Sequence, residues 1–154
     1  MLDAEVVRFL TGPVSAMLGT SDALAVPDVT RVAGVVAVDD HHLRVLIAAA
    51  AGTARANAVV GARAAVIATD ITTYRSLQWK GRVVAAGGER TPGDLAVLHR
   101  HVDTFVGASH RVGIAPELAD RFFPLEVVPI VVAVDELYDQ TPGPGAGRRI
   151  EVGR

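Results

Sequence analysis

The chain has no cysteine, so disulfides, thiolate metal sites and cysteine nucleophiles are all excluded. Aromatic residues make up only 5% of its 154 residues, and the formal net charge is −2 with no basic block. This combination argues against nucleic-acid binding through a broad electrostatic face. Long hydrophobic runs are missing too, because a charge, glycine or proline interrupts each one before the ~20 residues of a membrane span. The first ten residues also lack the basic start and apolar run of a signal peptide.

The composition is nevertheless hydrophobic, at 50% of the chain with a mean hydropathy of +0.34. Alanine and valine supply most of this fraction, and the length suits one domain. A globular chain of this size buries roughly 68–70% of its unfolded surface, so a single core is sufficient. We expect the excess apolar surface to lie at a subunit interface. The sequence therefore predicts a soluble, cytoplasmic oligomer with no membrane or nucleic-acid partner.

The alternation of apolar and polar residues indicates mainly strands joined by turns. Strands are expected at 15–21, 30–39, 43–51, 64–71, 72–88 and 126–137. Helices are expected at 3–10, 52–63, 91–107 and 116–123. This order favours a small antiparallel barrel with helices packed outside over a parallel doubly wound sheet. The fold class is therefore predicted as mainly β with peripheral helices.

The helix expected at 91–107 has the clearest local signals. Thr91 is placed at its N-cap, Pro92 at the first helical position and Asp94 at the third. Helical spacing predicts that one stripe of side chains faces the core. That stripe consists of Leu95, Leu98, Val102, Phe105 and Val106.

Proline and glycine mark two regions near the C-terminus. Pro129 lies inside the last expected strand and suggests an edge position or a bulge. The stretch QTPGPGAGRRI that follows this strand is not expected to hold regular structure. We therefore divide the chain into a domain at 1–140 and a Pro/Gly-rich tail at 141–154.

Three groups of polar side chains interrupt the apolar pattern. The groups are Arg31 on the second strand, then Thr53, Arg55 and Asn57 at the second helix, and finally Ser76, Gln78 and Lys80 on one face of the long strand. A helix N-terminus beside a hydroxyl and a guanidinium suits a phosphate. A glutamine can read the edge of a heteroaromatic ring, and a lysine adds a point charge. Trp79 points to the opposite face, where we expect the core or a subunit interface.

Each of these signals also has an ordinary structural interpretation. Arg55 can be a solvated charge, Gln78 can satisfy a backbone group, and Lys80 can protect a sheet edge from aggregation. His99 and His101 are two residues apart on a helix and face different directions, so no metal site is predicted. No Ser-His-Asp arrangement can be ordered from the sequence.

The sequence resembles the pyridoxamine 5'-phosphate oxidase-like proteins, which bind FMN in a split β-barrel. Four segments carry the resemblance: TRVAGVV, GTARAN, AAVIATD and RSLQWKG. They occur in the family's order over roughly residues 5–137, and this order is more specific than any one motif. The resemblance implies a six-stranded antiparallel split β-barrel that forms a homodimer with cofactor sites at the interface.

The resemblance also assigns roles to the polar groups. It implies that Arg31 contacts the flavin, that residues 53–57 grip the FMN phosphate, and that Gln78 and Lys80 reach the ring system. Ser76 shares their face of the strand. The Pro/Gly-rich tail can then fold over the partner subunit's flavin.

Two departures from the family pattern narrow the function. Asn57 follows Arg55 by two residues, whereas the family's asparagine follows its basic residue by three. The C-terminal tryptophan and Arg/His pair of true pyridoxamine phosphate oxidases are absent, since Trp79 is the only tryptophan, so pyridoxal phosphate synthesis is not expected. We expect an FMN-dependent oxidoreductase that acts on a small molecule, with no side chain that stands out as a catalytic acid or base. A deazaflavin-dependent reductase of the same fold, or a non-catalytic flavin- or haem-binding protein, are the alternatives.

Overall fold

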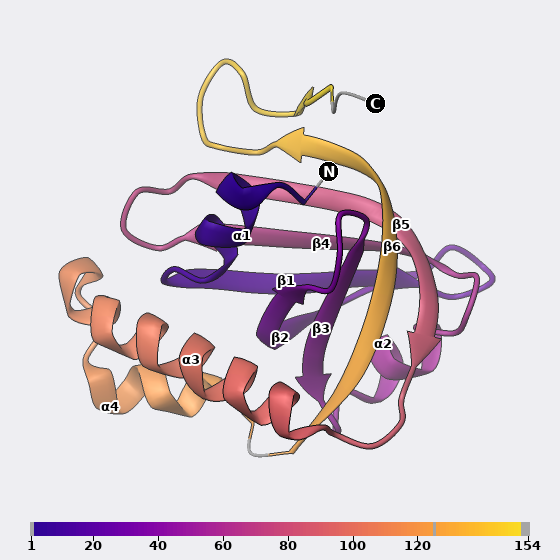
Figure 1. Cartoon of the computed structure of the whole chain (residues 1–154), viewed down its shortest axis with the longest axis horizontal. Helices are drawn as coiled ribbons and strands as arrows, with labels where there is room; N and C mark the ends of the chain where they lie inside the picture. Colours follow the sequence, from indigo (N-terminus) through magenta and orange to yellow (C-terminus); the bar gives the residue numbers. More distant parts are fainter. Residues whose placement is uncertain (1, 125, 152–154) are drawn as a thin grey trace.

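The computed structural model describes residues 2–124 and 126–151 and shows a closed barrel of six antiparallel strands (Figure 1). The strand order is β3-β2-β1-β4-β5-β6, and β6 pairs back onto β3 to close the barrel. The strands are β1 (Val14–Ser21), β2 (Pro27–Ala37), β3 (His42–Ala48), β4 (Arg63–Asp70), β5 (Ser76–Ala86), β6 (Val127–Asp139) and the short β7 (Arg148–Arg149). The predicted fold class, mainly β with a six-stranded antiparallel barrel, is therefore confirmed.

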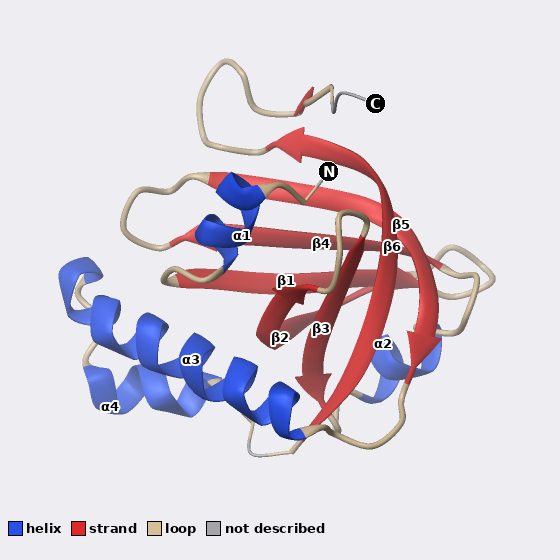
Figure 2. Cartoon of the chain, viewed as in Figure 1, coloured by secondary structure: helices blue, strands red, loops and turns tan. Residues whose placement is uncertain are grey.

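The helices lie outside the strands, as Figure 2 shows. They are α1 (Ala4–Leu10), α2 (Gly52–Asn57), α3 (Pro92–Ser109) and α4 (Pro116–Ala119), with 3₁₀ turns η1 (His110–Val112) and η2 (Asp120–Phe122). Buried side chains of α1 join the same core cluster as those of the barrel. Within residues 2–124 and 126–151, no helix combines the length and the apolar character needed to cross a membrane.

The barrel interior is filled by every second side chain of the strands. On β1, Val14, Ala16 and Leu18 are fully buried, while the residues between them are half-buried on the outer surface. Trp79 is also fully buried, as its place in the β5 alternation predicts. Alternation along β1 and β4 thus separates an apolar core from an outer surface that is free to carry polar groups. On β2 and β3 the outward side chains of Ala33 and Leu46 are buried as well, because α3 packs over them.

Helix α3 packs on the outside of β2 and β3 and begins with the predicted capping box. Thr91 accepts a hydrogen bond from the Asp94 N–H, and the Asp94 carboxylate accepts one from the Thr91 N–H. The same carboxylate receives two hydrogen bonds from Arg44 of β3, with N···O distances of 2.6 and 2.7 Å. This ion pair anchors the first turn of α3 on the barrel.

The predicted inward stripe of α3 is wrong in part. Leu95 is 38% exposed, whereas Val97 and His101 are buried beside Leu98 and Phe105. The ion pair explains the rotation, because it turns the face that carries Asp94 towards the barrel. Residues three and four positions further along the helix then follow the same face inwards.

Two predicted boundaries near the site are also corrected. Helix α2 ends at Asn57 instead of residue 63, because β-branched Val59 and Val60 and then Gly61, at φ 90°, follow it. Strand β5 begins at Ser76 instead of residue 72, because the Asp70 carboxylate accepts hydrogen bonds from the next residues and forms a turn.

The C-terminal predictions need correction as well. Strand β6 is not an edge strand, since it pairs with β3 on one side and β5 on the other, and Pro129 lies opposite Leu46. The irregularities in its pairing with β5 occur elsewhere, between Lys80 and Gly81 and between Val83 and Ala85 of β5. The Pro/Gly-rich stretch does hold regular structure, because β7 pairs with β6 and the Ile150 N–H donates to the Leu137 carbonyl.

Candidate functional site

One row of half-buried side chains crosses the outer surface of the barrel. The strand register places Arg31 opposite Met17, Met17 opposite Ile67, Ile67 opposite Gln78 and Gln78 opposite Tyr138. Adjacent strands are about 4.8 Å apart, so Arg31 and Gln78 lie roughly 14 Å apart along the sheet. An apolar floor of Met17 and Ile67 therefore has a polar group at each end.

The guanidinium of Arg31 is held in place from two sides. Its Nη1 donates a hydrogen bond to the Ser15 hydroxyl at 3.1 Å, and its Cζ lies 5.1 Å from the centre of the Phe122 ring. Partial burial lowers the pKa of Arg31 below its usual value. The α3–η2 segment thus covers the end of the row that carries Arg31.

A buried histidine, which the sequence analysis considered only as a metal ligand, lies in the same segment. His101 is 3% exposed and packs edge-to-face against Phe123, with ring centres 5.6 Å apart. Burial lowers the pKa of His101 to about 4, with smaller contributions from the charges of Arg100 and Arg31. The imidazole is therefore neutral at pH 7 and acts as part of the packing.

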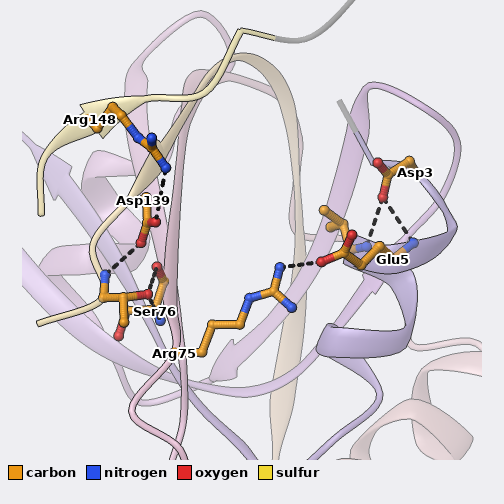
Figure 3. Close-up of polar contacts among 8 residues, drawn as sticks. Asp3, Glu5, Arg75, Ser76, Asp139 and Arg148 are labelled. Carbon is orange, nitrogen blue, oxygen red and sulfur yellow. Dashed lines mark hydrogen bonds and ion pairs between the residues drawn. The ribbon is translucent and has the colours of Figure 1, made fainter. Parts of the chain in front are cut away.

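Strand β5 carries two predicted site residues, Gln78 and Ser76, which differ in burial and in hydrogen-bond partner. The Gln78 side-chain oxygen accepts a hydrogen bond from the Gln140 amide at 3.1 Å. Ser76 is buried, and its hydroxyl is bonded to the Thr69 hydroxyl at 2.7 Å. Figure 3 shows Ser76 beside Asp139 and Arg148 of the C-terminal segment. The structure thus leaves Gln78 at the surface and encloses Ser76.

The loop before β5 is tied to the N-terminal helix (Figure 3). Arg75 donates to the Glu5 carboxylate at 2.6 Å, and its guanidinium lies 5.3 Å from the centre of the Phe9 ring. Asp3 caps α1 by accepting hydrogen bonds from two backbone N–H groups of its first turn. These contacts hold the start of β5, and hence the row of outward side chains that follows.

Lys80 lies in the next row of the same outer surface. The register places Gly19 opposite Ala65, Ala65 opposite Lys80 and Lys80 opposite Glu136. The Lys80 ammonium lies 4.6 Å from the centre of the Tyr138 ring. A hollow of about 230 Å³ opens over Gly19 and Ala65, with Lys80 in its lining.

Arg63 lines the same hollow and is a functional candidate that the sequence reasoning missed. Its guanidinium donates to Asp135 and to Glu136, each at 2.8 Å. Glu136 also accepts a hydrogen bond from the Tyr138 hydroxyl, which lowers the pKa of Glu136 and raises that of Tyr138. The signal available in the sequence was the period of two, which places Arg63 on the same face of β4 as Ala65 and Ile67.

The predicted phosphate-binding residues of α2 point to different places. Arg55 is exposed, donates one hydrogen bond to the Ala49 carbonyl at 3.3 Å, and lines a hollow of about 330 Å³ with Gly87 and Ile130. Thr53 is exposed at the helix start. Within the described chain, no side chain caps the first turn of α2. The Gly52 N–H donates to the Ala50 carbonyl at 2.8 Å, so an anion at this helix start would meet the N–H groups that follow Gly52.

Asn57 faces the other side of α2. It lines a hollow of about 430 Å³ together with Ser21 and Arg63, and these two residues also line the hollow beside Lys80. The Asn57 Nδ2 is buried and has no hydrogen-bond partner in the part of the chain that the structure describes. One chain therefore brings Asn57 towards Lys80 but leaves Arg55 in a separate hollow.

Comparison with known proteins adds the fold family. No family model and no curated protein matches the sequence. Among solved structures, HupZ from Group A Streptococcus matches with a TM-score of 0.58 and 15% identity over 96% of this chain and 100% of that chain. A pyridoxamine 5'-phosphate oxidase candidate from Lactobacillus delbrueckii matches with a TM-score of 0.54 and 17% identity, covering 89% and 93%.

An FMN-binding protein from Syntrophomonas wolfei also matches, with a TM-score of 0.54 and 15% identity over 97% of this chain and 87% of that chain. Similarity at these identities concerns the fold. The chain therefore has the fold of the pyridoxamine 5'-phosphate oxidase-like split barrels, and the resemblance inferred from the sequence is confirmed at that level.

Proposed function

We propose that the chain is an FMN-binding, flavin-dependent oxidoreductase that acts on a small molecule. The observation that supports this best is the row that runs from Arg31 over Met17 and Ile67 to Gln78. A flat heteroaromatic ring needs an apolar surface below it and polar groups at its edges. Met17 and Ile67 supply the surface, Arg31 supplies donors at one end, and Gln78 supplies a donor and an acceptor at the other.

The phosphate of FMN is assigned to the start of α2. Thr53 offers a hydroxyl, Arg55 offers a guanidinium with free donors, and the uncapped first turn offers N–H groups and the positive end of the helix dipole. Within one chain, Arg55 lies in a different hollow from Lys80. A site shared by two copies removes this difficulty, because one copy then grips the phosphate and the other contacts the ring.

Such a shared site requires a homodimer, which the outer surface favours. The described part of the chain has large exposed aliphatic side chains near the tip of the β1–β2 hairpin and after α2. They are Leu24, Val26, Val29, Val59 and Val60. A net charge of only −2 opposes the association of two copies weakly. Light scattering after size exclusion is expected to give twice the mass of one chain. If the protein is a monomer and still binds FMN, the shared site is refuted.

When bound, FMN supplies hydride and electron transfer at its ring. The residues of this chain bind and orient: Thr53 and Arg55 hold the phosphate, while Arg31 and Gln78 fix the ring edge. Met17 and Ile67 exclude water from one face of the ring. Lys80 places a positive charge beside it in the next row of the surface.

The test is a fluorescence titration of FMN into the protein and into Arg55→Ala. We expect this variant to bind FMN about tenfold more weakly, because a charge-assisted phosphate contact is lost, with stability changed by less than about 0.5 kcal/mol. Arg90→Ala removes the same charge from another exposed position and serves as the control. Equal FMN affinity in Arg55→Ala and the parent contradicts the phosphate assignment. A second titration uses a deazaflavin cofactor in place of FMN. If the deazaflavin binds more tightly than FMN, it is the ligand of this site.

A further inference from the structure

Lys80 is the only lysine of the chain, beside fourteen arginines. A lysine carries a compact, strongly hydrated point charge on a flexible stem, whereas arginine presents a planar fork. Lys80 is half-buried on the outer surface of β5. Its ammonium lies over the Tyr138 ring, and the residue lines the hollow above Gly19 and Ala65.

The carboxylate directly opposite Lys80 is bound by other groups. Lys80 and Glu136 are register partners, a position at which opposite charges ordinarily attract each other across strands. Glu136 instead accepts from Arg63 at 2.8 Å and from the Tyr138 hydroxyl. Arg63 also takes up the neighbouring Asp135 at 2.8 Å. Within the described residues, Lys80 therefore has an aromatic contact but no ion pair.

The hollow beside this ammonium has a floor of small residues. A Cβ added to Gly19 would meet the Ala65 carbonyl oxygen at 3.7 Å as its nearest neighbour, so the space above it is open. The nearby charged groups are Arg63 on β4, Arg82 on β5, Asp135 and Glu136 on β6, and Arg149 on β7. Arg63 binds both carboxylates but offsets only one of their two negative charges. Arg149, whose charge also acts on Glu136, offsets the other. Among these groups, Lys80 therefore carries a positive charge that remains for a ligand in the hollow.

We propose that this hollow binds the acidic group of a small molecule, a carboxylate, sulfonate or phosphate, on the Lys80 ammonium. Arg63 and Tyr138 act as positioning residues, because they hold Glu136 away from Lys80. If the proposed flavin function holds, the acid belongs to the substrate, which is then an anionic small molecule. Binding of the acid itself does not rest on the flavin.

The first test titrates 8-anilinonaphthalene-1-sulfonate, a fluorescent aromatic sulfonate, into cofactor-free protein. Arg63→Gln frees Glu136 to pair with Lys80, so affinity is expected to fall by about fivefold. Adding Glu136→Gln to Arg63→Gln is expected to recover at least about threefold, since the competing carboxylate is gone. Arg82→Gln, which removes a charge at the register partner of Arg63, is the matched control and should bind as the parent does.

The second test fills the hollow and follows the lysine. Gly19→Val keeps the strand and occupies the space above Ala65, so saturable binding of the sulfonate should be lost while the unfolding midpoint is retained. In the parent, bound sulfonate should slow trinitrophenylation of Lys80, read by peptide mass spectrometry, and in Gly19→Val it should not.

Unchanged binding in Gly19→Val or Arg63→Gln, no recovery in the double variant, or no saturable binding to the parent would overturn the proposal. Arg55→Ala should bind the sulfonate normally even if it loses FMN, so failure of one proposal is separable from failure of the other.

Discussion

The ion pair between Arg44 and Asp94 leads to a quantitative prediction about acid stability. The Asp94 side chain is 3% exposed and accepts hydrogen bonds from Arg44 and from the N–H and hydroxyl of Thr91. The Arg44 guanidinium, more than any other group, lowers the pKa of Asp94 from 3.8 to about 2. Because this pair anchors α3, it also supports the segment that covers Arg31.

The sign and size of the contribution of Asp94 to the free energy of unfolding follow from its pKa values in the unfolded and folded states. The folded state holds the proton of Asp94 more weakly than the unfolded chain does, so the pair stabilises the fold fully above pH 3.8 and progressively less as the pH falls towards 2. The difference corresponds to about 2 kcal/mol at pH 7. About 1 kcal/mol of this contribution remains at pH 3.

Urea unfolding of the parent and of Asp94→Asn at pH 7 and pH 3 measures this contribution. We expect Asp94→Asn to be less stable by about 2–3 kcal/mol at pH 7, since it loses the ion pair and weakens the capping box. The gap between the two proteins should shrink by about 1 kcal/mol at pH 3. Other carboxyl groups titrate in both proteins, so their effect cancels in the difference. A gap that stays constant between the two pH values would refute the assigned pKa and the pairing behind it.

Two further changes test the barrel and its attachment to α1. Gly81→Ala would place a Cβ 2.0 Å from the Ala133 carbonyl oxygen where β5 meets β6, so we expect a loss of about 3 kcal/mol in unfolding free energy, or failure to fold. Gly19→Ala is the control, because its Cβ would lie 3.7 Å from the nearest atom, and it should unfold thermally close to the parent. Arg75→Ala breaks an exposed ion pair with Glu5, so its cost in urea unfolding should stay below about 1 kcal/mol, and a larger loss would show that the stacking on Phe9 matters more.

The features that the sequence predicted well depend on near neighbours in the chain. The capping box of α3 involves Thr91 and Asp94, three residues apart, and its geometry is set by one turn of helix. The burial of Trp79 follows from the alternation along β5, because a strand sends successive side chains to opposite faces. The barrel follows from many such strands joined by short turns.

The features that it missed depend on contacts between distant residues. The partner of Asp94 lies 50 residues earlier on β3, and this contact turned Leu95 outwards and His101 inwards. The C-terminal stretch was expected to be irregular, yet pairing with β6 orders it despite its proline and glycine content. Neither segment contains a local sequence signal that predicts its partner, which is Arg44 for Asp94 and β6 for the C-terminal stretch.

The candidate site shows the same division. Sequence order and resemblance selected Arg31, Gln78 and Lys80, and the structure places all three on one outer surface. Register decided what surrounds them: an apolar floor between Arg31 and Gln78, and a carboxylate opposite Lys80 that Arg63 has already bound.

By itself, then, the amino-acid order determined the strand periodicity, the barrel class, the helix cap and the face of β5 that carries polar groups. Only the tertiary structure decided that Arg55 lies apart from Lys80 and that Lys80 pairs with no carboxylate among the described residues. It also decided that α3 presents its Asp94 face to the barrel. The reason is physical: backbone geometry propagates alternation along a strand residue by residue, whereas register and charge pairing are selected only when strands from distant parts of the chain meet.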